Sequence, residues 1–254
     1  MEKKQQYLLL CTLLEELMAI YISRRINLTI IGITNKNGRK YLPILICNFM
    51  ENINLRTADR NFEDCLGDVL LTVDRNFEDY LENVLLSGTN YNDKYVAFWG
   101  GCFSNFFPCQ FWLEGKLWTT SEKYFMWKKA VTFGDNETAE KILKLDSPRE
   151  IKKLGREVKN FTPDIWDKVK EDIMYAGVNA KFTQCAECNE CIKRFKEQKF
   201  VEGSPYDTIW GVGIHYQDEN VFDESKWRGE NLLGKILNRV RDEIFDDALN
   251  AYSE

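Results

Sequence analysis

Apolar residues recur at helical spacing through most of the chain after residue 90, in segments separated by loops that contain glycine and proline. A period of about 3.6 residues is typical of helices that turn one face toward a core. The pattern predicts helices over residues 120–131, 136–145, 148–154, 165–176, 184–197 and 230–246. Only short extended pieces fall between them, so we expect a mainly α, α+β domain.

The first 90 residues show a different pattern. Apolar residues at helical spacing predict a helix over 3–24, and the β-branched run at 26–33 predicts a strand. The sequence Asn-Lys-Asn-Gly at 35–38 is a turn signal, so residues 41–49 are expected to return as the second strand of a hairpin. This part is predicted to be a small α/β segment.

A duplication precedes a change in composition. The hexapeptide Asp-Arg-Asn-Phe-Glu-Asp at 59–64 recurs at 74–79, a shift of 15 residues. Because this shift is close to four helical turns, the copied apolar positions fall on nearly one face, and we expect one lengthened helix.

Aromatic residues and polar motifs become dense after residues 87–90, so we place a domain boundary there. It separates an N-terminal extension, 1–90, whose role stays open between regulation, partner binding and packing, from a second domain, 91–254.

The balance of charges limits the partners of this protein. Its 254 residues carry a formal net charge of −6, which argues against broad binding to nucleic acid through phosphates but is compatible with a local basic pocket. No apolar run reaches the roughly 20 residues that span a bilayer, and Glu15 and Glu16 interrupt the early apolar stretch at 7–19. We therefore expect a globular, cytoplasmic protein without a membrane segment.

Eight cysteines are too sparse for a fold built on disulfides, so we expect reduced thiols. Cys185, Cys188 and Cys191 are spaced by three and would lie along one side of a helix, and thiolates bind zinc. A fourth ligand is not evident, because His215, the only histidine, follows 24 residues after Cys191. The favoured interpretation is small buried thiols, with no metal site and a structural role for His215.

One loop concentrates candidate chemistry. Residues 202–213 contain Glu202 and Asp207 together with Trp210 and three glycines, and with Pro205 among them they cannot form a regular helix. Acids and a flat aromatic surface on a shaped loop suit a pocket for a sugar or a ring. A turn-forming aspartate and a core tryptophan would give the same pattern.

A second candidate lies at the start of the first predicted helix of this region, where Glu122 has two interpretations. With Thr119 it fits a capping box, in which each side chain satisfies a free amide at the helix start. With Met126 and Lys129 it lies on one helical stripe, because seven residues make almost two turns, and this would bring an acid and an amine to one cavity. A solvated charged face would show the same spacing.

Two further loops could hold a ribose or a phosphate. Asn105 lies among small residues at 100–106, where its amide could contact a sugar, although an ordinary turn would use the same residues. Asn231, in the stretch 227–234, is expected to be the N-cap of the last helix, and a helix N-terminus favours anions. Neither signal is specific alone.

The order and spacing of the motifs taken together are specific. They are Phe103-Ser104-Asn105-Phe106, Trp118-Thr119-Thr120-Ser121-Glu122-Lys123-Tyr124, Lys129-Ala130, Leu154-Gly155-Arg156, Trp166, Met174-Tyr175-Ala176-Gly177, Lys181-Phe182, Glu202-Gly203-Ser204-Pro205-Tyr206-Asp207, Trp210-Gly211-Val212-Gly213 and Asn231-Leu232-Leu233-Gly234. In this order they resemble the NADAR, or YbiA-like, family over about residues 95–245. Residues 1–90 lie outside the resemblance.

The resemblance implies a mostly α-helical YbiA-like fold and an N-glycosidase that cleaves a ribosyl C1′–N bond without a cofactor. Two substrate classes are known for such proteins: ribosylamino-pyrimidine phosphates from early riboflavin synthesis, and ADP-ribose attached to guanine in nucleic acid. By matching position, the implied catalytic candidates are Glu122, Lys129, Glu202 and Asp207. The implied substrate-binding candidates are Ser104, Asn105, Arg156, Trp166, Lys181, Trp210, Gly211 and Asn231.

Two mechanisms stay open. Breaking the bond develops positive charge on the sugar and negative charge on the departing base, so Glu122 and Asp207 could contact the sugar or transfer protons while Glu202 shapes that pair. Alternatively, Lys129 as a neutral amine could attack C1′ and form a Schiff base. An alternative of another class is a non-catalytic module that binds ADP-ribose or an NAD derivative. The three acids favour an enzyme.

Overall fold

The structure, a computed structural model, describes residues 83–251, with side chains as far as residue 247. The helix expected over 3–24, the hairpin expected over 26–49 and most of the duplicated segment lie outside the described residues.

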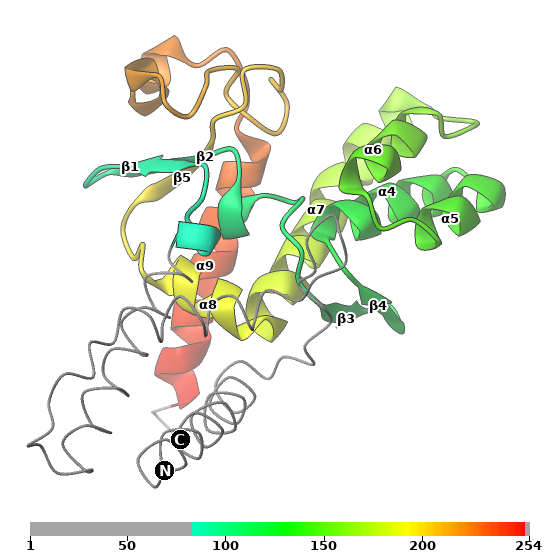
Figure 1. Cartoon of the computed structure of the whole chain (residues 1–254), viewed down its shortest axis with the longest axis horizontal. Coiled ribbons are helices and arrows are strands. Elements are labelled where there is room, and N and C mark those ends of the chain that lie inside the picture. The colour runs from blue at the N-terminus through cyan, green and yellow to red at the C-terminus, as the bar shows by residue number, and fades with distance from the viewer. Residues whose placement is uncertain (1–82, 252–254) are drawn as a thin grey trace, which may run out of the picture. The chain divides into compact units, whose positions relative to one another are not determined.

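The helices predicted from the apolar pattern are present in the described range (Figure 1). They are α4 (Ser121–Thr132), α5 (Asn136–Leu143), α6 (Pro148–Arg156), α7 (Pro163–Gln184), α8 (Ala186–Lys193) and α9 (Leu232–Ala251). Each overlaps its predicted range, and the expected mainly α, α+β class is confirmed.

Capping residues and prolines explain where several helices begin. Thr120, Asp135 and Ser147 precede α4, α5 and α6, and each side-chain oxygen accepts a hydrogen bond from the backbone amide three residues further on. Such a bond satisfies one of the amides that the first turn leaves free. Pro148 and Pro163 occupy the starts of α6 and α7, where the missing amide proton costs nothing.

The helix α7 continues to Gln184, although its predicted end is residue 176. Gly177 interrupts the sequence pattern at that point, because glycine is a poor helix former. In the structure α7 packs against α4 there, and a Cβ atom on Gly177 would lie 2.8 Å from Cδ1 of Tyr124. Close packing between the two helices therefore requires glycine and overrides its low helix propensity.

Two small sheets complete the described fold. The strands β1 (Thr89–Tyr91), β2 (Tyr95–Phe98) and β5 (Lys199–Glu202) form a sheet in the order β1-β2-β5, with β1 antiparallel and β5 parallel to β2. The strands β3 (Phe111–Leu113) and β4 (Lys116–Trp118) form an antiparallel hairpin. Glu114 and Gly115 join them with φ angles of 50° and 70°, as a tight two-residue hairpin turn requires.

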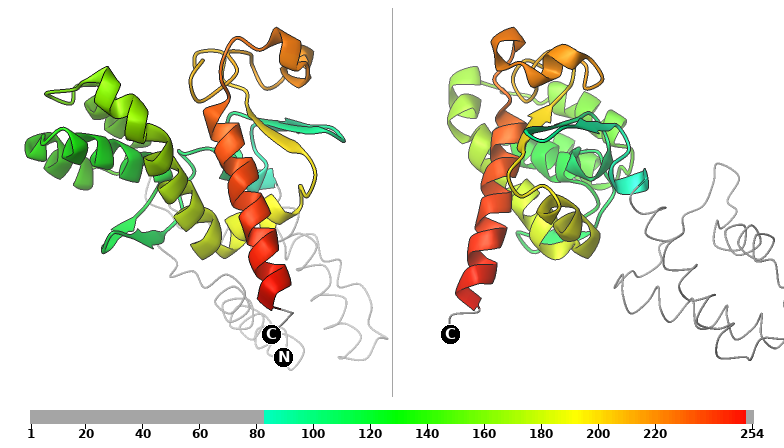
Figure 2. Two further views of the ribbon diagram at one scale, coloured as in Figure 1. Left: turned by 180° about the vertical axis from the view of Figure 1, so that it is seen from behind. Right: turned by 90° about the vertical axis from the view of Figure 1, so that its left-hand side faces the viewer.

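The helix α9 connects the three-stranded sheet to the other helices. It packs against β5 and against α7, as Figures 1 and 2 show. The helices α4, α5 and α6 pack together, and α4 also packs against α7. Aromatic rings fill the core under the sheet: the Phe103 ring centroid lies 4.8 Å from that of Phe200 and 5.6 Å from that of Phe98. These contacts fix the positions of β2 and β5.

The parallel pairing of β2 with β5 determines which loops meet. Phe98 and Glu202, the last residues of the two strands, are paired directly. Because parallel strands end at the same edge of a sheet, the loops that follow them start side by side. Residues 99–108 and 203–213 are thereby brought to one edge.

Candidate active site

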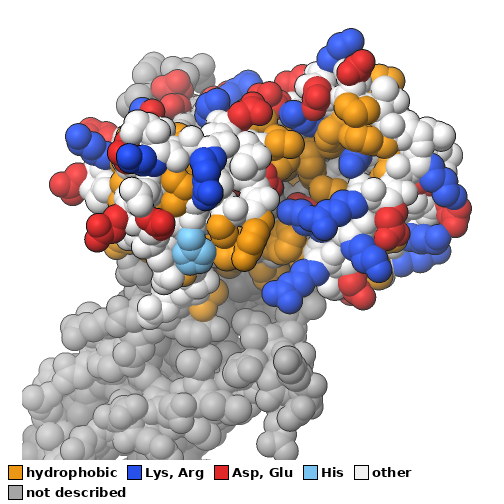
Figure 3. Space-filling view, turned by 90° about the horizontal axis from the view of Figure 1, so that it is seen from above, with side chains coloured by type: hydrophobic (Ala, Val, Ile, Leu, Met, Phe, Trp, Pro, Cys, Tyr) orange, Lys and Arg blue, Asp and Glu red, His pale blue; other side chains and the backbone are white. Residues whose placement is uncertain are grey.

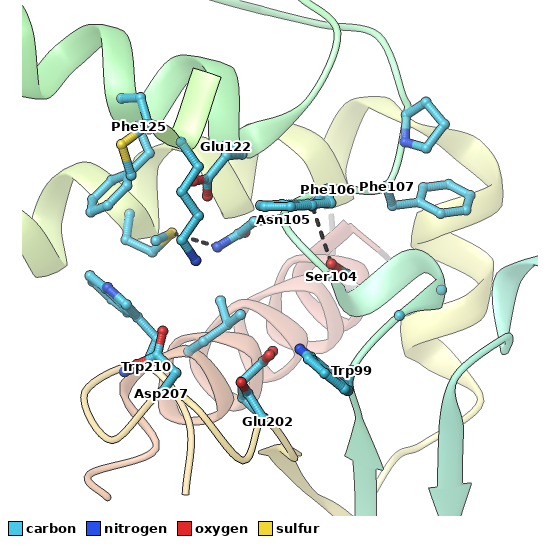
Figure 4. Close-up of a pocket in the computed structure, with 18 residues that line it drawn as sticks. Trp99, Ser104, Asn105, Phe106, Phe107, Glu122, Phe125, Glu202, Asp207 and Trp210 are labelled. Carbon is cyan, nitrogen blue, oxygen red and sulfur yellow. Dashed lines mark hydrogen bonds between the residues drawn. The ribbon is translucent and has the colours of Figure 1, made fainter. Parts of the chain in front are cut away.

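A cavity of about 420 Å³ lies where these two loops meet α4, α6 and α7. Figure 3 shows one face of the described residues, where hydrophobic side chains surround a hollow and Lys and Arg side chains lie at its border. In Figure 4, Glu122 projects from α4, while Glu202 and Asp207 come from β5 and the following loop. The cavity lining therefore includes three carboxyl groups from segments that are distant in sequence.

Glu122 is the second residue of α4, and the capping box expected with Thr119 is wrong. The N-cap is Thr120, whose hydroxyl accepts the bond from the Lys123 amide. The backbone amide of Glu122 donates to the Asn105 carbonyl at 3.0 Å, and its side chain is free of any capping role.

The Glu122 side chain is buried in the cavity, and its Oε1 atom has no hydrogen-bond partner. Burial raises the pKa of Glu122 to about 7, although the positive charge of Lys152 acts against this rise. A carboxyl group with such a pKa can donate or accept a proton near neutral pH.

Glu202 ends β5, and its backbone amide donates to Oδ1 of Asn231 at 2.9 Å. Burial, and next the charge of Asp207, raise the pKa of Glu202 to about 8. Glu202 therefore keeps a proton through much of the neutral range.

Asp207 combines the two interpretations that its sequence left open. Its Oδ1 atom accepts hydrogen bonds from the amides of Ile209 and Trp210 at 3.0 and 2.8 Å, so it does form a turn. Asp207 also lines the cavity. Trp210 is held in the lining by the same turn, and its ring meets that of Phe125 edge-on at 5.3 Å.

Ser104 and Asn105 line the cavity as well. The Asn105 side chain is buried, with Oδ1 accepting from the Ser121 hydroxyl at 2.9 Å and Nδ2 lying 3.2 Å from Sδ of Met174. The Ser104 carbonyl accepts a bond from Nζ of Lys181 at 2.9 Å. These bonds hold the loop after β2 against α4 and α7.

The remaining predicted site residues lie outside the cavity lining. Lys181 is almost fully buried and supports the loop through Ser104. Gly211 passes so close to its neighbours that a Cβ atom would lie 2.7 Å from the Glu202 carbonyl oxygen. Arg156 is exposed at the end of α6, and its charge slightly offsets the rise that burial causes in the pKa of Glu122.

Lys129 and Trp166 do not line the cavity. The Lys129 ammonium donates to the Gly155 carbonyl at 2.8 Å and lies 4.3 Å from the centroid of the Phe161 ring. Burial lowers the pKa of Lys129. The ring of Trp166 packs 5.1 Å from that of Phe125, which itself lines the cavity.

Asn231 directly precedes α9, but its side chain does not cap that helix. With a φ of 55°, it turns toward β5, where Nδ2 donates to the Phe200 carbonyl and Oδ1 accepts from the Glu202 amide, both at 2.9 Å. The expected anion-binding cap is thus replaced by a tie that positions Glu202.

Sequence reasoning missed Lys152 and Trp99, which both line the cavity. Lys152 is half-buried, and its positive charge partly offsets the rise that burial causes in the pKa values of Glu122 and Glu202. A signal did exist for Lys152: it lies four residues before Arg156, so both fall on one face of α6. Trp99 follows the last residue of β2, at the edge where the loops meet.

The cysteine triplet follows the expectation of buried thiols in part. Cys188 and Cys191 are buried, whereas Cys185 is half-buried and lies 3.3 Å from Oε2 of Glu187. Sγ of Cys191 lies 2.8 Å from Sγ of Cys102. Over residues 83–251, no group of three His, Cys, Asp or Glu side chains has an arrangement suited to a metal ion.

Within the same range, no helix has the length and apolar character needed to cross a bilayer.

This helical α+β fold, with three carboxyl groups and aromatic rings around one cavity, defines a small-ligand site of the kind that enzymes use. The model of the NADAR domain matches residues 97–245, more than half of the chain. The chain belongs to the NADAR domain family, and the resemblance drawn from its motifs is confirmed.

Several relatives are similar to this chain. N-glycosidase R617 of Acanthamoeba polyphaga mimivirus is 40% identical over 164 residues, which cover 59% of this chain and 96% of the relative. N-glycosidase YbiA of Escherichia coli is 33% identical over 144 residues, covering 57% and 81%. The NMR structure of E. coli YbiA covers 65% of this chain and 94% of its own, with 29% identity and a TM-score of 0.52. The expected YbiA-like fold is therefore confirmed.

Proposed function

We propose that this protein is an N-glycosidase that hydrolyses a ribosyl C1′–N bond in a phosphoribosyl or ADP-ribosyl substrate. The observation that carries the proposal is the buried, unpartnered carboxyl group of Glu122 in a cavity that it shares with Glu202 and Asp207. The relatives that are named N-glycosidases support the reaction class.

The three acids suit the charges that this reaction develops. Glu122, with a pKa of about 7, is the group we assign to protonate the departing base. Asp207 keeps Oδ2 free of the turn bonds that occupy Oδ1, and its negative charge would stabilise the positive charge on the sugar. Glu202, with its pKa of about 8, shapes this pair as a neutral neighbour.

The family resemblance and the size of the cavity support the proposed substrate classes. A volume of about 420 Å³ falls within the roughly 300–1,000 Å³ of small-molecule sites. Both classes, a ribosylamino-pyrimidine phosphate and ADP-ribose on guanine, present the same ribose C1′–N bond. ADP-ribosylated nucleic acid would approach through this one ribose, which does not require a basic surface over the whole protein.

The Schiff-base alternative is less well supported. The Lys129 ammonium is engaged by the Gly155 carbonyl and lies outside the cavity lining, so it would have to leave this bond to reach C1′. Borohydride added during turnover separates the routes, because it traps a covalent enzyme–sugar adduct only when an imine forms. We expect no adduct.

The test of the proposed function is cleavage by Glu122→Gln, which keeps the shape of the side chain but removes its titrating proton. Loss of a general acid should lower kcat/KM on the order of 10²- to 10⁴-fold. Release of the free base from both substrates, followed by mass spectrometry, measures this. Glu140→Gln is the matched control, because Glu140 is exposed on α5 away from the cavity.

Equal cleavage by Glu122→Gln and by the unaltered protein would refute the role of Glu122. Binding of ADP-ribose compounds that are recovered uncleaved from the unaltered protein would instead indicate a binding module.

A further inference from the structure

The cavity contains one positively charged side chain that the proposed chemistry does not yet use. Lys152 is the only Lys or Arg in the lining formed by the described residues. Its ammonium lies 5.5 Å from the centroid of the Phe106 ring. Within residues 83–247 it makes neither a hydrogen bond nor an ion pair, although three carboxyl groups line the same cavity.

The half-buried ammonium of Lys152 therefore has room for an anion that accepts its hydrogen bonds. Partial burial removes water from the ammonium, and a ring face at this distance returns only part of the lost interaction. A phosphate oxygen would supply the missing partner through a charge-assisted hydrogen bond. The position of Lys152 beside Phe106 therefore suits an anionic group of the ligand.

We propose that Lys152 binds the phosphate on O5′ of the ribose that loses its base, and that it makes the site select phosphorylated ribosyl substrates. This inference rests on the proposed function. It covers both substrate classes, because the reacting ribose carries a phosphate on O5′ in ribosylamino-pyrimidine phosphates and in ADP-ribose alike.

The charges around the cavity leave this as the favourable side for a phosphate. Glu202 and Asp207 lie on β5 and the loop after it, where a phosphate would be repelled by the negative charge of Asp207. Arg156 lies one helical turn after Lys152 on the same face of α6 and is exposed, so it extends the positive charge outward from the cavity. With its phosphate at Lys152, the ribose would then extend toward Asp207 on the opposite loop.

Another role for Lys152 would be purely electrostatic. Its charge lowers the pKa values of Glu122 and Glu202, and a residue that only did this would change the rates on all substrates alike. The phosphate role instead changes the ratio between a phosphorylated substrate and its dephosphorylated form. This ratio therefore distinguishes the phosphate-binding role of Lys152 from a purely electrostatic one.

The experiment compares kcat/KM of the full chain on a ribosylamino-pyrimidine 5′-phosphate and on the same compound without phosphate. We expect Lys152→Met to lose roughly 10- to 100-fold of the preference for the phosphate, the range for a lost charge-assisted hydrogen bond. Lys152→Arg, which keeps the charge, should retain most of the preference. Lys153→Met is the matched control, because Lys153 is exposed on the same helix and outside the lining.

An unchanged ratio in Lys152→Met, or no preference for the phosphate in the unaltered protein, would overturn the proposal. A binding measurement separates this outcome from failure of the glycosidase itself. By calorimetry, Lys152→Met should weaken ribose 5-phosphate and ADP-ribose by a similar factor and leave ribose unaffected.

Weakening of only one of the two ligands would contradict a phosphate site shared by both substrate classes, and weakening of neither would refute the role of Lys152. A protein that binds ribose 5-phosphate through Lys152 but cleaves no substrate would keep this inference and refute the glycosidase.

Discussion

Glu122 shows how one capping residue decides which chemistry a side chain can perform. A capping box with Thr119 would have engaged its carboxyl group at the helix start, but Thr120 caps α4 instead. The carboxyl group then enters the cavity with Oε1 unpartnered. The sequence could not separate the two outcomes, because either threonine fits the N-cap preference and the choice depends on how the preceding strand enters the helix.

The raised pKa of Glu122 predicts how activity depends on pH. As a proton donor, Glu122 is active when protonated, so kcat/KM should fall as the pH rises through about 7. Initial rates on either side of neutrality, with a substrate that does not titrate there, measure this. The residual activity of Glu122→Gln should lack the same fall. A rate that increases through pH 7 would contradict a donor role.

The raised pKa of Glu202 predicts a stability that depends on pH. The folded state holds the Glu202 proton up to about pH 8, whereas the unfolded chain loses it near the ordinary glutamate pKa of 4.5. Between these values the folded state binds more protons, so the free energy of unfolding decreases as the pH rises. Glu202→Gln, which cannot ionise, should be more stable than the unaltered protein at pH 8 by at least about 1 kcal/mol.

Urea denaturation at the acidic and the basic ends of this window measures the difference. The exposed Glu140→Gln variant should follow the unaltered protein at both ends. If Glu202→Gln showed the same loss of stability with rising pH as the unaltered protein, Glu202 would not be the group responsible.

At the level of elements, the tie between β5 and α9 holds Glu202 in place. Asn231→Ala removes both bonds of its side chain and leaves the Phe200 carbonyl and the Glu202 amide without these partners. Two buried polar groups left unpaired should cost roughly 2–4 kcal/mol of unfolding free energy, measured by denaturation. We also expect lower kcat at a pH where Glu202 stays protonated, because its backbone is released.

Asn238→Ala, a change within α9, is a matched comparison. Asn238 accepts one bond, from the Phe200 amide, and its replacement should cost about 1 kcal/mol. Equal losses for the two variants would contradict the special role of Asn231.

The sequence predicted the existence of the helices better than their lengths and orientations. Apolar periodicity located α4 to α9, but it ended α7 at Gly177, because the need for glycine there comes from Tyr124 on another helix. Periodicity also placed Lys152 and Arg156 on one face of α6 without indicating that this face adjoins the cavity. Asn231 was located at the helix start, but its bonds to β5 depend on tertiary structure.

At the scale of the whole molecule, the parallel pairing of β2 with β5 assembles the candidate site. It brings the loop with Ser104 and Asn105 beside the loop with Asp207 and Trp210, a proximity that helical and strand patterns alone do not predict. Only the family resemblance assigned residues of both loops to one site. The structure places six of the twelve predicted site residues in the cavity lining. The boundary near residue 90 and the role of the extension stay predictions.

The central claim is that the intact protein breaks a ribosyl C1′–N bond. The measurement that tests it most directly is mass-spectrometric identification of the products when the full chain is incubated with the ribosylamino-pyrimidine phosphate and, separately, with an ADP-ribosyl-guanine oligonucleotide. We predict a free base with ribose 5-phosphate, or unmodified guanine with ADP-ribose, from at least one of them. Full recovery of both substrates under conditions where the protein is folded would contradict the account.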